Sequence, residues 1–284
     1  MDSLVTKEKQ AIALIRSFEK KHGTFELCYS GGKDSDVILH LCKVAGVNCR
    51  PIYRSTTIDP PGTITHVIKN GVEINRPKIT FFELVRKKGI PTRRARFCCS
   101  VLKEYPIMKA ACLGIRREES SRRALRYKEP TICRVYSKSV HVEQLLPILE
   151  WTNDDIFKYI IGENIQLHPL YYTDGVLHVE RRLGCIGCPL KSDCGKGEFL
   201  KYPKFFKAHM KAAAEWWITH PSAKSHVKFE TIFHLVFYDL FCSSYQHYLD
   251  SVYTMFDKLN VRAYLEDYFS VDLSDVQQFL DDNL

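Results

Sequence analysis

The chain opens with apolar side chains at helical spacing and then alternates short apolar runs with amphipathic stretches. Apolar residues at positions 4, 11, 14, 15 and 18 share one helical face, which predicts a helix over residues 4–18. The apolar run "TFELCY" (24–29) predicts a buried strand, and residues 34–45 predict the next helix. The chain therefore begins with a helix followed by a strand–helix unit.

The alternation of strands and helices continues to about residue 180. "VNCRPIYRST", "VEINRP" and "MKAACLGIR" predict strands, and "TICRVY" and "VEQLLPIL" are strand-like. "PPGTITHVIKNG", "TFFELVRKKG" and "TNDDIFKYIIGEN" predict helices, the last with Thr152 as its N-cap. This order indicates an α/β fold, a Rossmann-like, doubly wound and mostly parallel sheet with helices on both faces.

The pattern changes at about residue 181. A cysteine-bearing loop precedes a helix that starts near Pro203, and residues 226–260 are rich in aromatic side chains. We therefore expect an N-terminal helix (1–22), a sheet domain (23–180), and a cysteine loop with a helical C-terminal lobe (181–284).

Charge and composition narrow the class of protein. The net charge of +8 is concentrated in two basic runs, residues 86–97 and 114–128, which suit a polyanion or a phosphorylated small molecule. No apolar run is long enough to span a membrane, and the N-terminus lacks the apolar core of a signal peptide. We expect a cytoplasmic protein without a membrane partner, in which the odd number of cysteines, 11, does not form a disulfide framework.

The hexapeptide "SGGKDS" follows the first predicted strand, and we call it the PP-loop (residues 30–35). Gly31 and Gly32 let backbone N–H groups approach an anion, and the next helix adds its positive end. Lys33 adds a full charge, and Ser30 and Ser35 add hydroxyl donors. The spacing fits neither the Walker A loop nor the dinucleotide pattern, so we expect a different phosphate-binding loop.

The PP-loop resembles the pyrophosphate loop of the N-type ATP pyrophosphatases, the adenine nucleotide alpha hydrolase-like superfamily. "STTIDPPG", "RFCCSVLK", "GIRREESSRR", "LLPILEWTNDDIFKYI" and "RRLGCIGCP" resemble, in order, elements of its phosphoadenosine-phosphosulfate (PAPS) reductase family. The resemblance spans roughly residues 24–200. The spacing of Cys185, Cys188 and Cys194 is similar to that of the DNA phosphorothioation enzymes in this family.

The resemblance and the residue chemistry together give the expected site. We expect Lys33, Asp34 and Arg116 to be catalytic. The expected nucleotide-binding residues are Ser30, Gly31, Gly32, Lys33, Asp34, Ser35, Thr57, Asp59, Gly114, Arg116 and Arg117. Arg116 and Arg117 follow a predicted strand at its carboxyl end, where arginine forks suit phosphate or sulfate. An ion pair with Glu118 or Glu119 is the alternative for these arginines.

A metal centre is the second expectation. Cys185, Cys188 and Cys194 place three thiols on one loop, and Cys98 is the expected fourth ligand, with Cys99 as its alternative. Four thiolates suit zinc or iron, and the resemblance implies a four-iron four-sulfur cluster.

The expected function is an enzyme of sulfur metabolism, an ATP pyrophosphatase and sulfurtransferase. It would cleave ATP, bound with Mg²⁺, to AMP and pyrophosphate and so adenylate an acceptor for sulfur transfer. A nucleic-acid acceptor and a sulfur-donor protein such as a cysteine desulfurase are the implied partners. Assimilatory reductases of the family carry a C-terminal Glu-Cys-Gly-Leu-His element, whereas this chain ends "VDLSDVQQFLDDNL", and Cys242 suits core packing better than nucleophilic chemistry. A PAPS or adenylyl sulfate reductase and a non-catalytic nucleotide-binding subunit are the alternatives.

Overall fold

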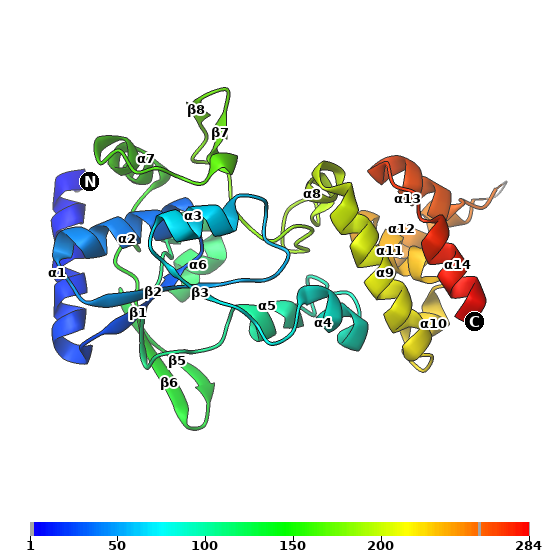
Figure 1. Cartoon of the computed structure of the whole chain (residues 1–284), viewed down its shortest axis with the longest axis horizontal. Coiled ribbons are helices and arrows are strands. Elements are labelled where there is room, and N and C mark those ends of the chain that lie inside the picture. Colours follow the sequence, from blue (N-terminus) through cyan, green and yellow to red (C-terminus); the bar gives the residue numbers. More distant parts are fainter. Residues whose placement is uncertain (1–2, 255–256, 284) are drawn as a thin grey trace. The chain divides into compact units, whose positions relative to one another are not determined.

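The computed structural model describes residues 3–254 and 257–283, which form two compact units (Figure 1). The first unit contains the described residues up to 55 together with residues 60–76 and 104–184. The second contains residues 56–59, residues 77–103 and the described residues from 185 onward. The division differs from the one expected from sequence, because residues 77–103 belong with the C-terminal helices.

A six-stranded sheet forms the centre of the first unit. Its strands are β1 (Phe25–Tyr29), β2 (Cys49–Arg54), β3 (Glu73–Asn75), β4 (Ala110–Cys112), β5 (Thr131–Ser137) and β6 (Val140–Leu145). They lie in the order β3-β2-β1-β4-β6-β5, and all neighbours are parallel except β5 and β6. The structure thus confirms an α/β fold with a mostly parallel sheet, to which β5 adds an antiparallel edge strand.

Helices and short connections complete the first unit. They are α1 (Leu4–His22), α2 (Lys33–Ala45), α3 (Thr63–Lys69), α6 (Ser121–Arg126), α7 (Asn153–Gly162), the 3-10 turns η1 (Arg117–Glu119) and η2 (Pro169–Tyr171), and the small hairpin of β7 (Tyr172–Thr173) and β8 (Val176–Leu177). In α1, the Ser3 hydroxyl accepts from the N–H of Thr6 and starts the helix. Ala11, Ile15 and Phe18 form its buried stripe, as the sequence pattern predicts.

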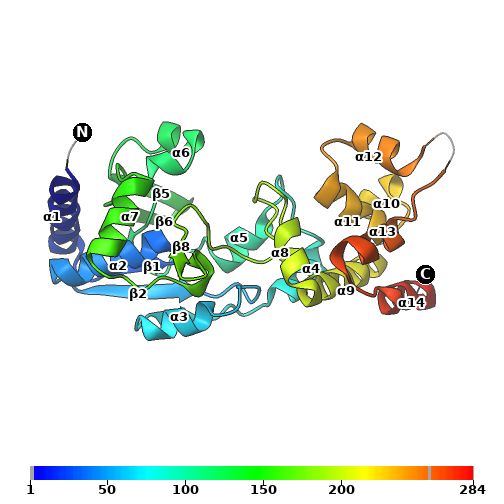
Figure 2. The same ribbon diagram turned by 90° about the horizontal axis from the view of Figure 1, so that it is seen from above.

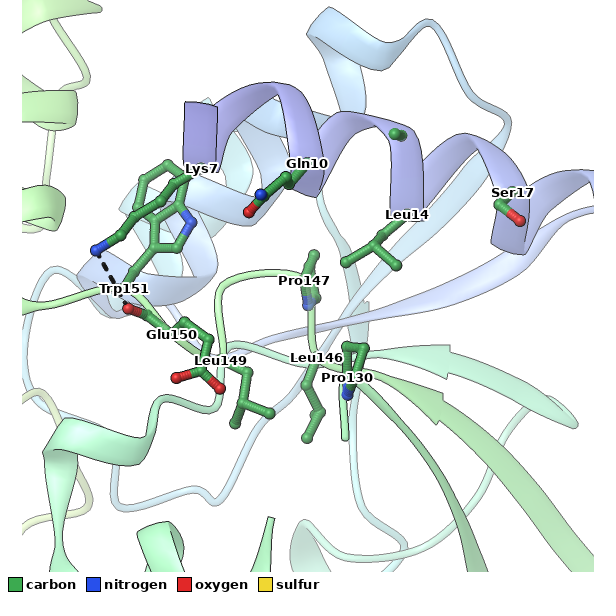
Figure 3. A pocket seen from close by; sticks show the side chains of 11 residues that line it. Lys7, Gln10, Leu14, Ser17, Pro130, Leu146, Pro147, Leu149, Glu150 and Trp151 are labelled. Carbon is green, nitrogen blue, oxygen red and sulfur yellow. Dashed lines mark hydrogen bonds between the residues drawn. The ribbon is translucent and has the colours of Figure 1, made fainter. Parts of the chain in front are cut away.

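A groove of about 490 Å³ lies between α1 and residues 146–151 (Figure 3). Its lining is mainly apolar and includes Leu14, Leu146 and Trp151. Lys7 and Glu150 are its charged lining residues, and the Lys7 ammonium donates to the Glu150 carbonyl (3.4 Å). This lining does not have the chemistry of a phosphate site.

The second unit is helical. Its helices are α4 (Phe81–Lys88), α5 (Phe97–Leu102), α8 (Lys196–Lys201), α9 (Pro203–Thr219), α10 (Ser225–Lys228), α11 (Ile232–Phe241), α12 (Tyr245–Val252), α13 (Val261–Phe269) and α14 (Ser274–Asn283). Helix α9 packs against α4, α8, α11 and α14 (Figure 2). Phe206, Met210, Ala213 and Trp217 are buried along α9, which confirms the predicted apolar face. None of the described helices combines the length and apolar character needed to cross a membrane.

Candidate functional site

The PP-loop lies between the carboxyl end of β1 and the first turn of α2, as the sequence predicts. Helix α2 begins at Lys33, and the N–H groups of Ser35 (2.9 Å) and Asp36 (3.0 Å) in its first turn donate to the Gly32 carbonyl. Gly31 has a φ of 75°, a left-handed conformation that glycine adopts without strain. The Ser35 hydroxyl donates to the Gly32 carbonyl (2.7 Å) and lies 3.1 Å from the Ser30 hydroxyl. The loop therefore combines helix-end N–H groups and hydroxyls, which suits an anion.

A cavity of about 300 Å³ borders the PP-loop. Residues 113–115, which follow β4, form another part of its wall. A Cβ atom at Gly114 would lie 3.1 Å from the backbone carbonyl carbon of Asp34, so the two segments approach closely because this residue is glycine. Strand β1 has β2 on one side and β4 on the other, and such a change of direction is where α/β sheets bind ligands. The cavity is also lined by Cys28, Glu119, Arg123, Tyr171, Arg182 and Leu183.

Lys33 is a buried cation at this cavity, with 4% of its surface exposed. Its ammonium lies 3.6 Å from an Asp34 carboxylate oxygen and donates to the Arg181 carbonyl (3.3 Å). Burial lowers the pKa of Lys33, and Arg116 and Arg182 act in the same direction, while Asp34 opposes them. Because Asp34 also pairs with Arg116 at 2.6 Å, Lys33 shares its counter-charge and can accept a further anion.

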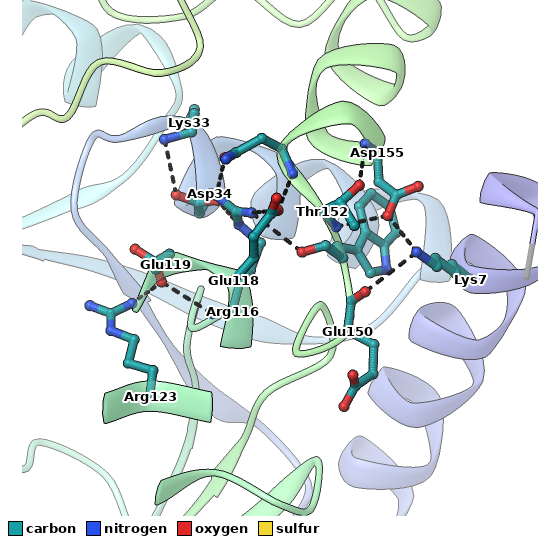
Figure 4. A network of polar contacts seen from close by, with 12 residues as sticks. Lys7, Lys33, Asp34, Arg116, Glu118, Glu119, Arg123, Glu150, Thr152 and Asp155 are labelled. Atoms are coloured by element: carbon teal, nitrogen blue, oxygen red, sulfur yellow. Dashed lines mark hydrogen bonds and ion pairs between the residues drawn. The ribbon is translucent and has the colours of Figure 1, made fainter. Parts of the chain in front are cut away.

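Arg116 is almost fully buried, with 1% of its surface exposed, and its three guanidinium nitrogens all donate to protein atoms (Figure 4). Nε donates to Asp34 (2.6 Å), Nη1 to Glu118 and the Trp151 carbonyl (both 3.3 Å), and Nη2 to Asn153 (2.9 Å). These contacts engage all three guanidinium nitrogens with protein atoms, and a role of Arg116 in anion binding stays a prediction. The ion-pair alternative is realised with Glu118.

Arg117 also points to protein partners. Its guanidinium lies 2.6 Å from a Glu150 carboxylate oxygen and donates to the carbonyls of Tyr127 (2.8 Å) and Lys128. It does not belong to the lining of the PP-loop cavity. Neither Arg116 nor Arg117 lines the cavity, so the positive charge of its wall comes from other side chains.

Two arginines that the sequence reasoning did not select line the cavity instead, Arg123 and Arg182. The Glu119 carboxylate pairs with Arg123 (Figure 4). The same carboxylate lies 3.8 Å from the Arg182 guanidinium. Arg123 lies within the basic run 114–128, but the run does not show which of its arginines faces the cavity. Tyr171, also unselected, accepts from the N–H of Lys33 through its hydroxyl (3.1 Å).

Thr57 and Asp59 belong to the second unit and form hydrogen bonds within it. The Asp59 carboxylate accepts from the N–H (2.8 Å) and the hydroxyl (2.6 Å) of Thr56. Thr57 has a φ of 65°, and its hydroxyl accepts from the N–H of Phe81 (2.8 Å). Neither is among the residues that line the PP-loop cavity, so their part in nucleotide binding stays a prediction.

A buried polar cluster fixes the first turn of α2. The His66 ring nitrogen Nε2 lies 3.0 and 3.1 Å from the two Asp36 oxygens, and the Tyr29 hydroxyl donates to Asp36. Asn70 donates to the Tyr29 hydroxyl (3.2 Å). Burial raises the pKa of Asp36, while His66 and Tyr29 lower it. Sequence spacing does not predict this cluster, because its members come from three separate elements.

Four cysteines line one small cavity of the second unit. Cys98 and Cys99 come from α5, and Cys185 and Cys188 come from the loop before α8. The hydrogen bond with Cys99, burial and the charges of the neighbouring sulfurs raise the pKa of Cys98. Burial raises the pKa of Cys188, and Cys185 and Cys99 raise it further. The four sulfurs are therefore close enough to repel one another when ionised.

The donor set of this cavity fits a four-thiolate metal centre. Lys103 also lines it; burial acts to lower the pKa of Lys103, but the charges of Cys185 and Asp59 outweigh this and raise it. A buried cation beside four thiols would offset part of the charge of the thiolates. Among residues 3–254 and 257–283, no three His, Cys, Asp or Glu side chains lie in metal-binding positions. A metal centre at these four cysteines is therefore a proposal.

Cys194, an expected ligand, is not among the residues that line this cavity, and its part as a ligand stays a prediction. It lines a different cavity of the second unit together with Cys242. Cys99, expected as the alternative ligand, lies with Cys98, Cys185 and Cys188 instead. The spacing of the cysteines in the sequence does not predict that Cys194 lines a different cavity from Cys185 and Cys188.

The sheet order, the PP-loop and its cavity define an α/β protein whose candidate site has the chemistry to suit an anion. Residues 24–191 match the family model of the phosphoadenosine phosphosulfate reductase domain. This match covers more than half of the chain, and the protein therefore belongs to that family.

Relatives are distant. An uncharacterised protein of Methanocaldococcus jannaschii is 27% identical over 72% of this chain and 52% of its own length. Sulfate adenylyltransferase subunit 2 of Shewanella frigidimarina is 26% identical over 58% of this chain and 66% of its own length. The chain thus spans about half to two thirds of the length of these curated relatives. A crystal structure of PAPS reductase from Candida auris in a phosphate complex has a TM-score of 0.44 and 16% identity, covering 64% of this chain and 93% of that one. A likeness at this level carries no functional information.

Proposed function

We propose that the protein binds ATP with Mg²⁺ in the PP-loop cavity and cleaves it to AMP and pyrophosphate, adenylating an acceptor for sulfur transfer. The observation that carries this proposal is the buried Lys33 at the start of α2, where β1 and β4 lie side by side. An incompletely paired cation at a helix N-terminus favours a phosphate chain. Membership of the PAPS reductase family supports an adenine nucleotide.

The residues divide into contacting and positioning groups in this proposal. Lys33 and the PP-loop N–H groups stabilise the charge that develops on the leaving pyrophosphate. Arg123 and Arg182 supply further positive charge from the cavity wall. Asp34 and Arg116 hold Lys33 in place through their ion pair and touch the nucleotide less directly. Mg²⁺ would arrive with the triphosphate, within reach of the carboxylates that line the cavity.

We further propose that Cys98, Cys99, Cys185 and Cys188 hold a four-iron four-sulfur cluster, with zinc as the alternative for the same thiolates. When bound, such a cluster would supply an iron site suited to sulfur chemistry, held by these four thiolates. Lys103 would offset the charge of the thiolates around it. Their shared cavity supports this choice over a ligand set that includes Cys194.

The proposed acceptor is a nucleic acid, and a cysteine desulfurase is the proposed donor. Exposed arginines of the two basic runs are the proposed contacts for this acceptor. Arg116 and Arg117 pair with carboxylates, and Arg123 pairs with Glu119 at the PP-loop cavity. Arg122 and Arg126 are exposed, and the run 86–97 adds Arg94. Phosphate contacts by these side chains would make binding salt-dependent.

A sulfonucleotide reductase is the second candidate, favoured by the description of the family. A binding titration of anaerobically purified protein distinguishes the two, with ATP–Mg²⁺ compared with phosphoadenosine phosphosulfate. Tighter binding of ATP supports acceptor adenylation. Tighter binding of the sulfonucleotide, with release of sulfite, would overturn it. Binding of ATP without release of pyrophosphate, even with DNA or RNA present, would indicate a non-catalytic subunit.

A further inference from the structure

A second cavity of the second unit contains two cysteines that the proposed metal centre does not use. Cys194 lies in the turn before α8, and Cys242 directly follows α11. Both thiols are partly buried and line this cavity of about 480 Å³, which we call the thiol cavity. Burial raises the pKa of Cys242 to about 11, and the charge of Lys196 acts to lower it. The cavity therefore holds two partly buried thiols beside a cation.

Cys194 has an unusual backbone. Its φ of 59° is left-handed, a conformation that costs a residue with a Cβ about 1–2 kcal/mol relative to its ordinary regions. The N–H of Cys194 donates to the Lys191 carbonyl (3.1 Å), and Asp193 accepts from the N–H groups of Gly195 (2.9 Å) and Gly197 (2.8 Å). These bonds hold the strained turn in place. The turn therefore fixes the place of Cys194 in the loop.

Charged side chains of both signs line the thiol cavity: Arg93, Arg94 and Lys196 are basic, and Asp193 and Asp239 are acidic. The Lys196 ammonium lies 4.8 Å from the centre of the Phe241 ring, and the structure shows no carboxylate partner for it in the described part of the chain. Arg94 is exposed on the same lining. Arg93 donates to the carbonyls of Pro189 (2.9 Å), Lys191 and Ser192 (3.3 Å), so it fixes the loop. Lys196 and Arg94 therefore remain to stabilise an anion beside the thiols.

The thiol cavity adjoins the four-cysteine cavity. Pro189 lines both of them. The same loop carries Cys185 and Cys188 on one side of this proline and Cys194 on the other. A sulfur atom held on Cys194 would thus be one loop turn from the proposed metal centre.

We propose that the thiol cavity accepts sulfur as a persulfide on Cys194, with Cys242 as a second thiol that can take it over. This inference rests on the sulfur-transfer function proposed above. The Cys194 sulfur attacks the outer sulfur of a donor persulfide, R–S–SH, and the S–S bond of the donor breaks. Cys194 then carries S–SH, and its former thiol proton leaves on the donor thiol, R–SH. The exchange needs no oxidant or reductant, and Lys196 and Arg94 stabilise the persulfide anion.

The test loads the anaerobically purified, metal-containing protein with glutathione persulfide without ATP. Alkylation, proteolysis and mass spectrometry then locate the added sulfur. We expect it on the peptides of Cys194 or Cys242, and its loss from them in the double variant Cys194→Ser, Cys242→Ser. Cys133→Ser is the matched control, because Cys133 is exposed on β5 and belongs to neither cavity. Lys196→Met should slow loading several-fold while both thiols remain.

Added sulfur found on Cys133 or on the four clustered cysteines alone would overturn the proposal. A total sulfur load that the double variant leaves unchanged would do the same. Because loading is measured without nucleotide, its failure is separate from a failure of ATP cleavage, which pyrophosphate release reports.

Discussion

The guanidinium of Arg116 contacts protein atoms in the structure, whereas the sequence predicts that this residue binds an anion. It is buried and neutralises Asp34 beside the PP-loop. Arg116→Ala would leave that carboxylate with only its longer contact to Lys33 (3.6 Å), so we expect the free energy of unfolding to fall by about 3 kcal/mol. Urea denaturation measures this change.

Arg122→Ala is the matched control for this prediction, because Arg122 lies in the same basic run and is exposed. It should change the free energy of unfolding by less than about 0.5 kcal/mol. An Arg116→Ala protein as stable as the control would show that the buried ion pair does not support the loop.

The residues of the candidate site differ in how far sequence could predict them. The PP-loop is local, and its glycines, lysine and serines imply their geometry directly. Arg123 and Arg182 are far apart in sequence and meet at one cavity through the fold. The burial of Arg116 depends on Asn153 and the Trp151 carbonyl, which approach from the start of α7. Such contacts are set by tertiary packing, which residue spacing does not encode.

Helix α9 carries a pH-dependent element of the second unit. His209 is buried in the core, its ring centre 6.1 Å from that of Phe81 and 5.6 Å from that of Phe199. Burial lowers the pKa of His209 to about 4, whereas an unfolded histidine has a pKa of about 6.5. Between these values the unfolded chain binds more protons than the folded one. The free energy of unfolding should therefore fall by about 1.4 kcal/mol for each unit that the pH drops from about 6.5 to about 4.

Replacing His209 with phenylalanine isolates this contribution. We expect His209→Phe to lose less stability than the wild type between pH 7 and pH 5 in denaturant titrations. His168, whose burial also lowers its pKa to about 4, remains in both proteins, so the difference reports His209. Parallel pH profiles would refute the assignment.

The elements that sequence predicted best are those with a one-sided apolar pattern. Helices α1 and α9 bury the stripes that their spacing indicates. Helix α5 was missed, because it is short and its N-cap position, Arg96, makes no side-chain capping bond. The antiparallel pairing of β5 with β6 was also missed. Strand direction depends on the connection, and the turn between Ser137 and Val140 contains no glycine or asparagine to mark a hairpin.

The second unit is assembled from segments far apart in the chain, and the proposed metal centre would join two of them. Cys98 and Cys99 lie on α5, and Cys185 and Cys188 lie on the later loop. Cys99→Ser should therefore lower the iron content of anaerobically purified protein, and Cys194→Ser should leave it near the wild-type level. Iron analysis together with the visible absorption spectrum measures both.

Removing the metal should also lower the thermal stability of the second unit, because the metal then no longer links α5 to the later loop. Chelation is expected to lower the thermal midpoint of the wild type and to have little effect on Cys99→Ser. Loss of iron in Cys194→Ser with retention in Cys99→Ser would reverse the ligand assignment.

The central claim is that this molecule cleaves ATP between the α- and β-phosphates with Lys33 in the PP-loop. The most direct measurement is the release of pyrophosphate and AMP from ATP–Mg²⁺, with DNA or RNA offered as acceptor. We compare the wild type with Lys33→Ala and with Lys138→Ala, an exposed lysine on the turn between β5 and β6. The account predicts equal amounts of AMP and pyrophosphate from the wild type and Lys138→Ala, and a rate about a hundredfold lower in Lys33→Ala. Products of ADP and phosphate, or a rate that Lys33→Ala leaves unchanged, would contradict it.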